Sequence, residues 1–132
     1  MIIRITPDKE KARSMINMIK DREIFLSSVD IGKFSTIAAE NYYEIIKELA
    51  SVTLLLDGYK ATGENAHKDL IDYLNNYKEI TEEEIIIMDD LRIKRNKSSY
   101  EGKRIESIYL QNKKDKLILI INKLKKLVNN RL

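Results

Sequence analysis

The chain has 132 residues, no cysteine and a formal net charge of +3. At this length we expect a single domain over residues 1–132, and the lack of cysteine excludes disulfide frameworks, thiolate nucleophiles and zinc ribbons. With 43% hydrophobic residues, 34% charged residues and one proline, the composition is typical of a strongly helical globular protein. There is no signal-peptide pattern and no apolar run near the roughly 20 residues that a bilayer requires, so we expect a soluble, cytoplasmic protein without a membrane partner.

Hydrophobic spacing and helix start signals predict five helices joined by short loops. Thr6-Pro7-Asp8 has the form of a helix start with Thr6 as the N-cap, and Thr81-Glu82-Glu83-Glu84 has the form of a capping box. The segment Leu49–Leu56 is apolar on nearly every side, as in the central helix of a bundle, whereas Lys97-Ser98-Ser99 is expected to interrupt the fourth helix. We therefore expect an all-α, up-and-down bundle of four to five helices. The expected segments are an extended tail over 1–6 and helices over about 7–28, 35–59, 64–77, 81–96 and 101–129.

Positive charge is concentrated in the last third of the chain. Residues 1–91 carry 11 Lys or Arg and 18 Asp or Glu, a net charge of −7, whereas residues 92–132 carry 13 and 3, a net charge of +10. Such a segment favours phosphate binding, because Lys and Arg that neutralise phosphates release condensed counterions. The pattern equally allows basic and acidic helices that pack side by side, or an acidic protein partner. The candidate RNA-binding cations are Arg92, Lys94, Lys97, Lys103, Arg104, Lys113, Lys114 and Lys116.

Few residues form a catalytic or metal-binding pattern. The single histidine, His67, lies at helical spacing from Leu70 and Leu74, which favours a packing or capping role over a catalytic one. The carboxylates show no metal-ligand spacing and no Gly-rich loop could hold a phosphate, so we expect neither a metal nor a cofactor. Asp90 and Lys94 have the spacing of an i,i+4 ion pair.

Arg95 stands apart because it continues an apolar stripe. It follows Met88 and Leu91 on the face of the fourth helix that should meet other protein. A guanidinium placed there needs a carboxylate, carbonyl groups or a bound anion, because an unpaired buried charge is heavily penalised. Two interpretations stay open: an internal ion pair, or a cleft at a frayed helix end in which a phosphate accepts the bidentate hydrogen bonds of Arg95.

At this position the sequence resembles the HEPN family, which comprises small all-helical domains associated with nucleotides and RNA. The family signature is an Arg, usually followed by a polar residue, and a His four to six residues later; here Arg95-Asn96 supply the first two, and Tyr100 stands where the His would be. Upstream, residues 58–63 and 67–74 look like the helix-loop-helix that precedes the family's motif helix. The resemblance covers about residues 40–125.

The resemblance implies a homodimer that brings two motifs into a shared cleft, acting as a toxin-like, metal-independent ribonuclease with a nucleotidyltransferase-like antitoxin as its partner. Arg95 would then stabilise charge on the scissile phosphate, and Asn96 would orient the neighbouring group. Tyr100, with a reference pKa of about 10, would donate a hydrogen bond instead of acting as a general base. The alternatives are a non-catalytic HEPN-like domain that binds a nucleotide, RNA or a protein, and a plain helical scaffold.

Overall fold

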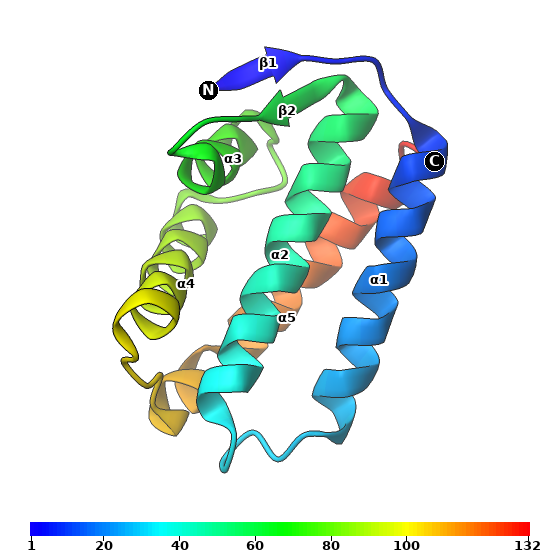
Figure 1. Cartoon of the computed structure of the whole chain (residues 1–132). Helices are drawn as coiled ribbons and strands as arrows, with labels where there is room; N and C mark the ends of the chain where they lie inside the picture. Colours follow the sequence, from blue (N-terminus) through cyan, green and yellow to red (C-terminus); the bar gives the residue numbers. More distant parts are fainter.

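The centre of the fold is helix α2 (Ser35–Asp57), around which the other long helices pack. The computed structural model describes residues 1–132, and α1 (Lys9–Ser28), α4 (Glu82–Glu101) and α5 (Ser107–Asn129) all contact α2. Figure 1 shows α1 beside α2, α5 crossing behind α2, and α4 on the side of α2 opposite to α1. The expected all-α bundle is therefore confirmed.

Burial explains why α2 takes the central position. Ile45, Leu49 and Val52 on α2 have at most 2% of their surface exposed, and the segment predicted to be apolar on nearly every side is buried almost throughout. α5 contributes the apolar stripe expected from its spacing, with Leu117 and Leu124 fully buried. The buried hydroxyl of Thr53 on α2 donates to the Leu49 carbonyl oxygen at 2.9 Å and is thus satisfied within the helix.

A small two-stranded sheet closes one end of the bundle. β1 (Ile2–Arg4) pairs antiparallel with β2 (Tyr59–Ala61), with Ile3 opposite Lys60. The extended conformation of the N-terminal tail agrees with the sequence, whereas β2 was not predicted. A three-residue strand carries no periodicity of its own, because it forms only against a partner that is distant along the chain.

Two helix boundaries in the first half differ from the sequence-based prediction. The N-cap of α1 is Asp8, whose carboxylate accepts from the Lys11 amide at 2.9 Å, and not Thr6. The third helix is also shorter than predicted. It comprises α3 (Ala66–Tyr73) followed by a 3-10 turn over Leu74–Asn76.

The predicted interruption of α4 is wrong. The helix continues through Ser98 to Glu101 and ends at Gly102, which adopts a φ of +67°. The Ser98 hydroxyl lies 2.8 Å from the Arg95 carbonyl oxygen and 3.0 Å from a carboxylate oxygen of Glu40 on α2. These contacts satisfy the polar side chain without breaking the helix. As a result, α5 begins at residue 107 instead of 101.

Candidate functional site

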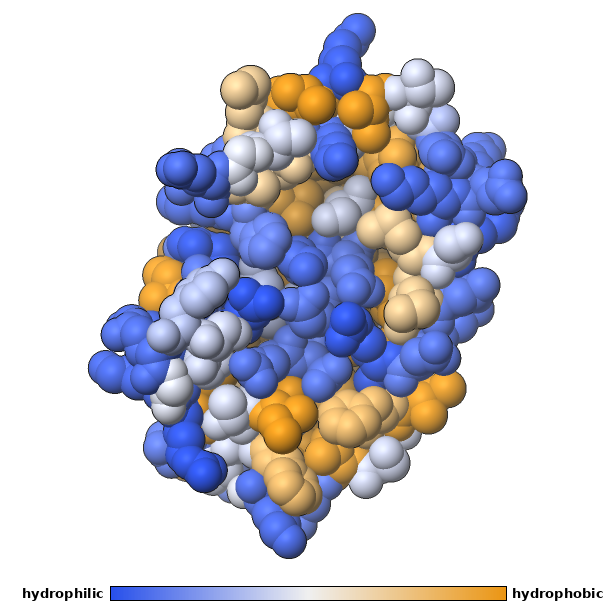
Figure 2. Space-filling model, in the orientation of Figure 1, coloured by the Kyte–Doolittle hydropathy of each residue, from blue (hydrophilic) through white to orange (hydrophobic).

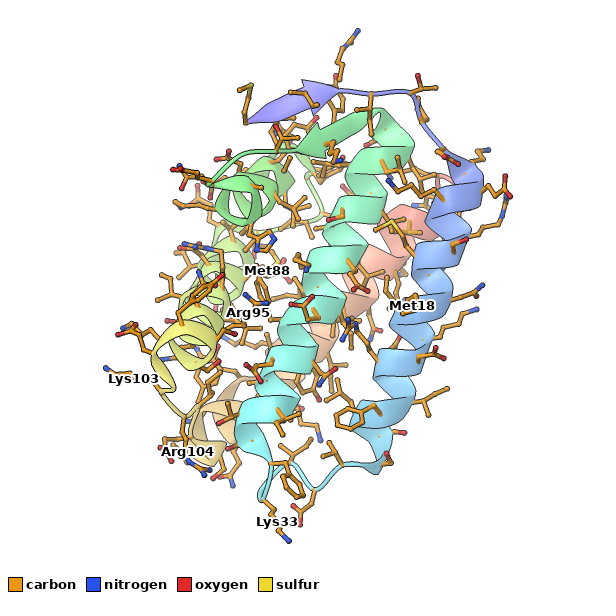
Figure 3. The ribbon with its side chains drawn as sticks, in the orientation of Figure 1. Met18, Lys33, Met88, Arg95, Lys103 and Arg104 are labelled. Carbon is orange, nitrogen blue, oxygen red and sulfur yellow. The ribbon has the colours of Figure 1, made fainter.

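Arg95 points from α4 toward α2, as Figure 3 shows. Its Nη2 donates to Oε1 of Glu44 at 3.2 Å, and its Nη1 lies 3.5 Å from Oδ1 of Asn96. Only 22% of the Arg95 side chain is exposed. Of the two interpretations that the sequence left open, the internal ion pair is the one present in the fold.

Glu44 is held between two cations. Besides Arg95, Lys47 one turn later on α2 pairs with Glu44 at 2.7 Å. Burial acts to raise the pKa of Glu44, but the hydrogen bond and charge of Lys47, together with the charge of Arg95, outweigh burial and lower it. Glu44 is therefore ionised at neutral pH, and an anion would have to displace it to bind Arg95 in a bidentate manner.

Two further polar side chains accompany Arg95 where α2, α3 and α4 meet. The Arg95 Cζ lies 5.6 Å from the ring centre of Tyr43, and the His67 ring lies 6.3 Å from the same ring centre. Tyr43 is 1% exposed, its hydroxyl has no hydrogen-bond partner, and burial raises its pKa to about 12. We call Arg95, Glu44, Tyr43 and His67 the Arg95 cluster.

The environment of the Arg95 cluster favours a neutral His67. Partial burial lowers the pKa of His67, and the charges of Lys47 and Arg95 lower it further. A neutral imidazole beside a guanidinium can act as a general base and accept a proton from a reacting group, whereas an imidazolium cannot. Sequence spacing did not reveal this neighbour of Arg95, because the two residues lie on different helices and meet only through Tyr43.

Tyr100 lies outside the Arg95 cluster. Since α4 stays helical to its end, the five residues from Arg95 to Tyr100 place the two side chains about 140° apart around the helix axis. Tyr100 is 79% exposed, and its hydroxyl makes no hydrogen bond within the chain. The fold therefore brings Asn96 to Arg95 and leaves Tyr100 on the surface.

The connection between α4 and α5 forms a second feature, a cleft of about 310 Å³. Four cations line this cleft together with the carboxylates of Asp90 and Glu106, and none of the four takes part in an ion pair within the chain. The predicted ion pair from Asp90 to Lys94 is absent, and the Lys94 Nζ instead lies 5.0 Å from the ring centre of Tyr109. The four cations, which define the basic cleft, are Lys94, Lys97, Lys103 and Arg104.

The other cations of residues 92–132 are largely neutralised inside the fold. Six of the 13 pair with carboxylates from residues 1–91, so basic and acidic helices do pack side by side. Among the predicted RNA-binding residues, Arg92 pairs with Asp89 and Lys116 with Glu83, while Lys114 lies apart, in a cavity lined by α1, α2 and α5. Lys113 is half-buried and has no ion-pair partner. The six paired cations are Arg92, Arg95, Lys116, Lys123, Lys125 and Arg131.

No group of three or more His, Asp or Glu side chains is arranged to hold a metal ion. None of the helices combines the length and the apolar character needed to cross a membrane. No family model, curated protein or solved structure matches the chain. The basic cleft and the Arg95 cluster are the two places where the fold gathers residues that the sequence singled out.

Proposed function

We propose that this protein is a HEPN-like, RNA-associated domain that binds RNA through the basic cleft. The observation that supports this most is the distribution of unpaired cations. Seven of the 13 cations of residues 92–132 lack an ion-pair partner, and four of the seven line this single cleft. Unpaired Lys and Arg in a concave surface bind phosphates without first breaking an internal pair.

The position of the cleft suits an extended polyanion. Lys94 and Lys97 lie one turn apart on α4, while Lys103 and Arg104 come from the loop that follows it. Figure 3 shows Lys103 and Arg104 at the edge of the molecule where α4 joins α5, so a strand passing along this edge would meet several cations in succession. Backbone contacts of this kind position RNA without reading its sequence.

Metal-independent RNA cleavage is the second candidate function. The observation that favours it is the Arg95 cluster, in which a guanidinium and a neutral imidazole flank one tyrosine ring. In this candidate a phosphate displaces Glu44 from Arg95, and Asn96 keeps its contact with the guanidinium. His67 accepts the proton of the ribose 2′-hydroxyl as the 2′-oxygen attacks phosphorus; the P–O5′ bond breaks, which leaves a 2′,3′-cyclic phosphate and a 5′-hydroxyl that takes its proton from water. The nucleotidyltransferase-like antitoxin belongs to this toxin-like candidate. Tyr100 is too far around α4 to take part from the same chain.

A homodimer, which the family resemblance implies, is part of the proposal. Arg95 does not itself require a second subunit, because Glu44 of the same chain already pairs with it. Support comes instead from the end of the molecule where α1 joins α2, at which Phe25, Phe34 and Ile37 are each more than 40% exposed. Figure 2 shows apolar surface gathered at this end. Exposed apolar clusters of this kind mark protein interfaces.

RNA binding is tested by neutralising two cations of the basic cleft. The double variant Lys103→Gln/Arg104→Gln should bind a fluorescein-labelled, mixed-sequence single-stranded RNA about tenfold more weakly at about 50 mM salt, measured by fluorescence anisotropy. The matched control is Lys20→Gln/Lys126→Gln, which makes the same change in net charge at exposed lysines outside the cleft. Equal losses in both variants would show that net charge, and not the cleft, determines binding.

A further inference from the structure

A second cavity lies at the opposite end of the molecule from the basic cleft. Its volume is about 310 Å³, and most of its lining is apolar, including Met15 of α1 and Leu54 of α2. The segment after β1 closes one end, because the Ile5 amide donates to the Gly58 carbonyl oxygen at 2.9 Å. Gly58 has a φ of +87°, and a Cβ there would come within 3.2 Å of the Ile5 carbonyl oxygen, so the close approach depends on glycine.

The polar residues of this cavity are almost all basic. Four separate elements each contribute one: Lys11 from α1, Lys47 from α2, Lys60 from β2 and His67 from α3. No carboxylate lines the cavity, and neither Lys11 nor Lys60 takes part in an ion pair. Figure 2 shows apolar surface between hydrophilic side chains near the β1 end of this face. The cavity therefore combines an apolar interior with a positively charged rim.

We propose that this cavity binds a small amphipathic carboxylate, whose apolar body fills the interior and whose single negative charge meets the lysines of the rim. A volume of this size falls within the range of small-molecule sites, which are mostly apolar with a few placed polar groups. A cationic ligand would be repelled by the rim. A neutral apolar ligand would fill the interior but leave the positive charges uncompensated.

The cavity is separate from the basic cleft. β1, β2 and α3 lie at one end of the bundle, and the connection of α4 to α5 lies at the other. Two residues link the cavity to the Arg95 cluster: His67, which belongs to both, and Lys47, which lines the cavity and pairs with Glu44. Lys11 and Lys60 have no contact with either RNA-related feature, so variants at these positions test the cavity alone.

The single histidine of the chain gives a direct probe, because His67 lines the cavity and its imidazole proton signals in an NMR spectrum have no competitor. Decanoate, kept below its micellar concentration, should shift these signals saturably. A bound carboxylate should also raise the pKa of His67, since it partly cancels the charge of Lys47 that lowers it.

Two control ligands separate the apolar chain from the charge. Decanol, which has the same chain without the charge, should bind about tenfold more weakly. Acetate, which has the charge without the chain, should give no saturable shift. Absence of a saturable shift with decanoate, or equal affinity for decanol, would overturn the proposal.

The rim lysines provide the second test. The variant Lys11→Gln/Lys60→Gln should weaken decanoate binding about fivefold and leave decanol binding unchanged. The control Lys9→Gln/Lys20→Gln removes two exposed lysines of α1 that do not line the cavity, and it should bind decanoate like the wild type. A rim variant that binds decanoate as tightly as the wild type would contradict the assignment of the headgroup. RNA affinity should be the same in all of these variants, so failure here does not bear on the basic cleft.

Discussion

A guanidinium on an apolar helix face needs a partner, and Glu44 supplies it for Arg95. The need was predictable from the sequence, because Arg95 follows Met88 and Leu91 at helical spacing. The partner was not predictable, since Glu44 lies on another helix 51 residues away. The same limit applies to His67, whose place beside the Tyr43 ring depends on how α3 packs against α2.

Removing Arg95 should destabilise the fold moderately. Arg95→Ala should lower the free energy of unfolding by about 1–2 kcal/mol, because the hydrogen bond to Glu44 is charged but the pair is only half-buried. Urea denaturation followed by circular dichroism measures this. Lys97→Ala, an exposed position on the same helix, is the control and should stay within about 0.5 kcal/mol of the wild type. If Arg95→Ala matched this control, the ion pair would contribute nothing to stability.

Substitutions at His67 and Tyr100 test which of the two residues supports the candidate RNA cleavage. If the protein cleaves RNA without metal, His67→Asn should abolish cleavage while Tyr100→Phe retains it, because only His67 lies near Arg95. Chelator-treated protein and a labelled RNA on a denaturing gel provide the measurement. Tyr100→His should not raise activity, since the new imidazole would also point away from Arg95. A strong gain from Tyr100→His would instead mean that the two motif positions meet, for example across a dimer.

Acid should weaken the fold in two stages. The folded-state pKa of His67 is lowered, so the unfolded chain binds a proton first and stability begins to fall as the pH drops below the ordinary value of about 6.5. Glu44 and Glu84 also have lowered pKa values, so their contributions are complete above the ordinary value of 4.5 and are lost as the pH falls through their folded pKa values. Urea midpoints between pH 8 and pH 3 report both stages. His67→Asn should remove the first stage only, and an unchanged profile in that variant would contradict its assignment to His67.

At the scale of elements, α4 shows what local sequence signals could and could not predict. Its start was predicted in detail: the Thr81 amide donates to Glu84 Oε1 at 2.9 Å and the Glu84 amide donates to the Thr81 hydroxyl at 3.1 Å, so the capping box is confirmed. The end of α4 was predicted wrongly, because the polar residue Ser98 suggested a break in the helix. Its hydroxyl instead contacts Glu40 and the Arg95 carbonyl oxygen, so the helix continues. Strand β2 was missed for a related reason, since only its pairing with β1 defines it.

Gly102 determines where α4 ends. Gly102→Ala should lower the free energy of unfolding by about 1 kcal/mol, because the residue has a φ of +67° and a new Cβ would meet no neighbouring atom, which leaves backbone strain as the only cost. The matched control is Gly32→Ala, where φ lies outside the left-handed region and a Cβ makes ordinary contact with Asp30; it should change stability by less than about 0.5 kcal/mol. Equal effects of the two substitutions in thermal unfolding would contradict this account.

At the scale of the whole molecule, ion pairs within the fold account for about half of the positive charge of residues 92–132. Six cations of residues 92–132 pair with acidic residues of the first 91: one pair lies within α4, two join α5 to α4, and three join α4, α5 and Arg131 to α1 or α2. Four of the seven unpaired cations line the basic cleft. The net charge of each segment was readable from the sequence, but the division between paired and unpaired cations depends on tertiary contacts.

The apolar end formed by Phe25, Phe34 and Ile37 predicts the oligomeric state. Multi-angle light scattering at low micromolar concentration should report about twice the monomer mass of 15.5 kDa. Phe34→Ser/Ile37→Ser should shift the protein to the monomer, because both side chains are exposed and their loss removes apolar contact area without opening the core. A wild-type monomer, or a dimer that this variant leaves intact, would contradict the proposed interface.

The salt dependence of RNA binding tests the central proposal most directly. Four cations of the basic cleft that neutralise phosphates predict a log–log slope of about −3 for single-stranded RNA, and Lys103→Gln/Arg104→Gln should reduce its magnitude by about 1.4. Anisotropy titrations between about 50 and 200 mM salt provide both slopes. A wild-type affinity that is insensitive to salt, or a slope that the double variant leaves unchanged, would contradict binding of RNA through the basic cleft.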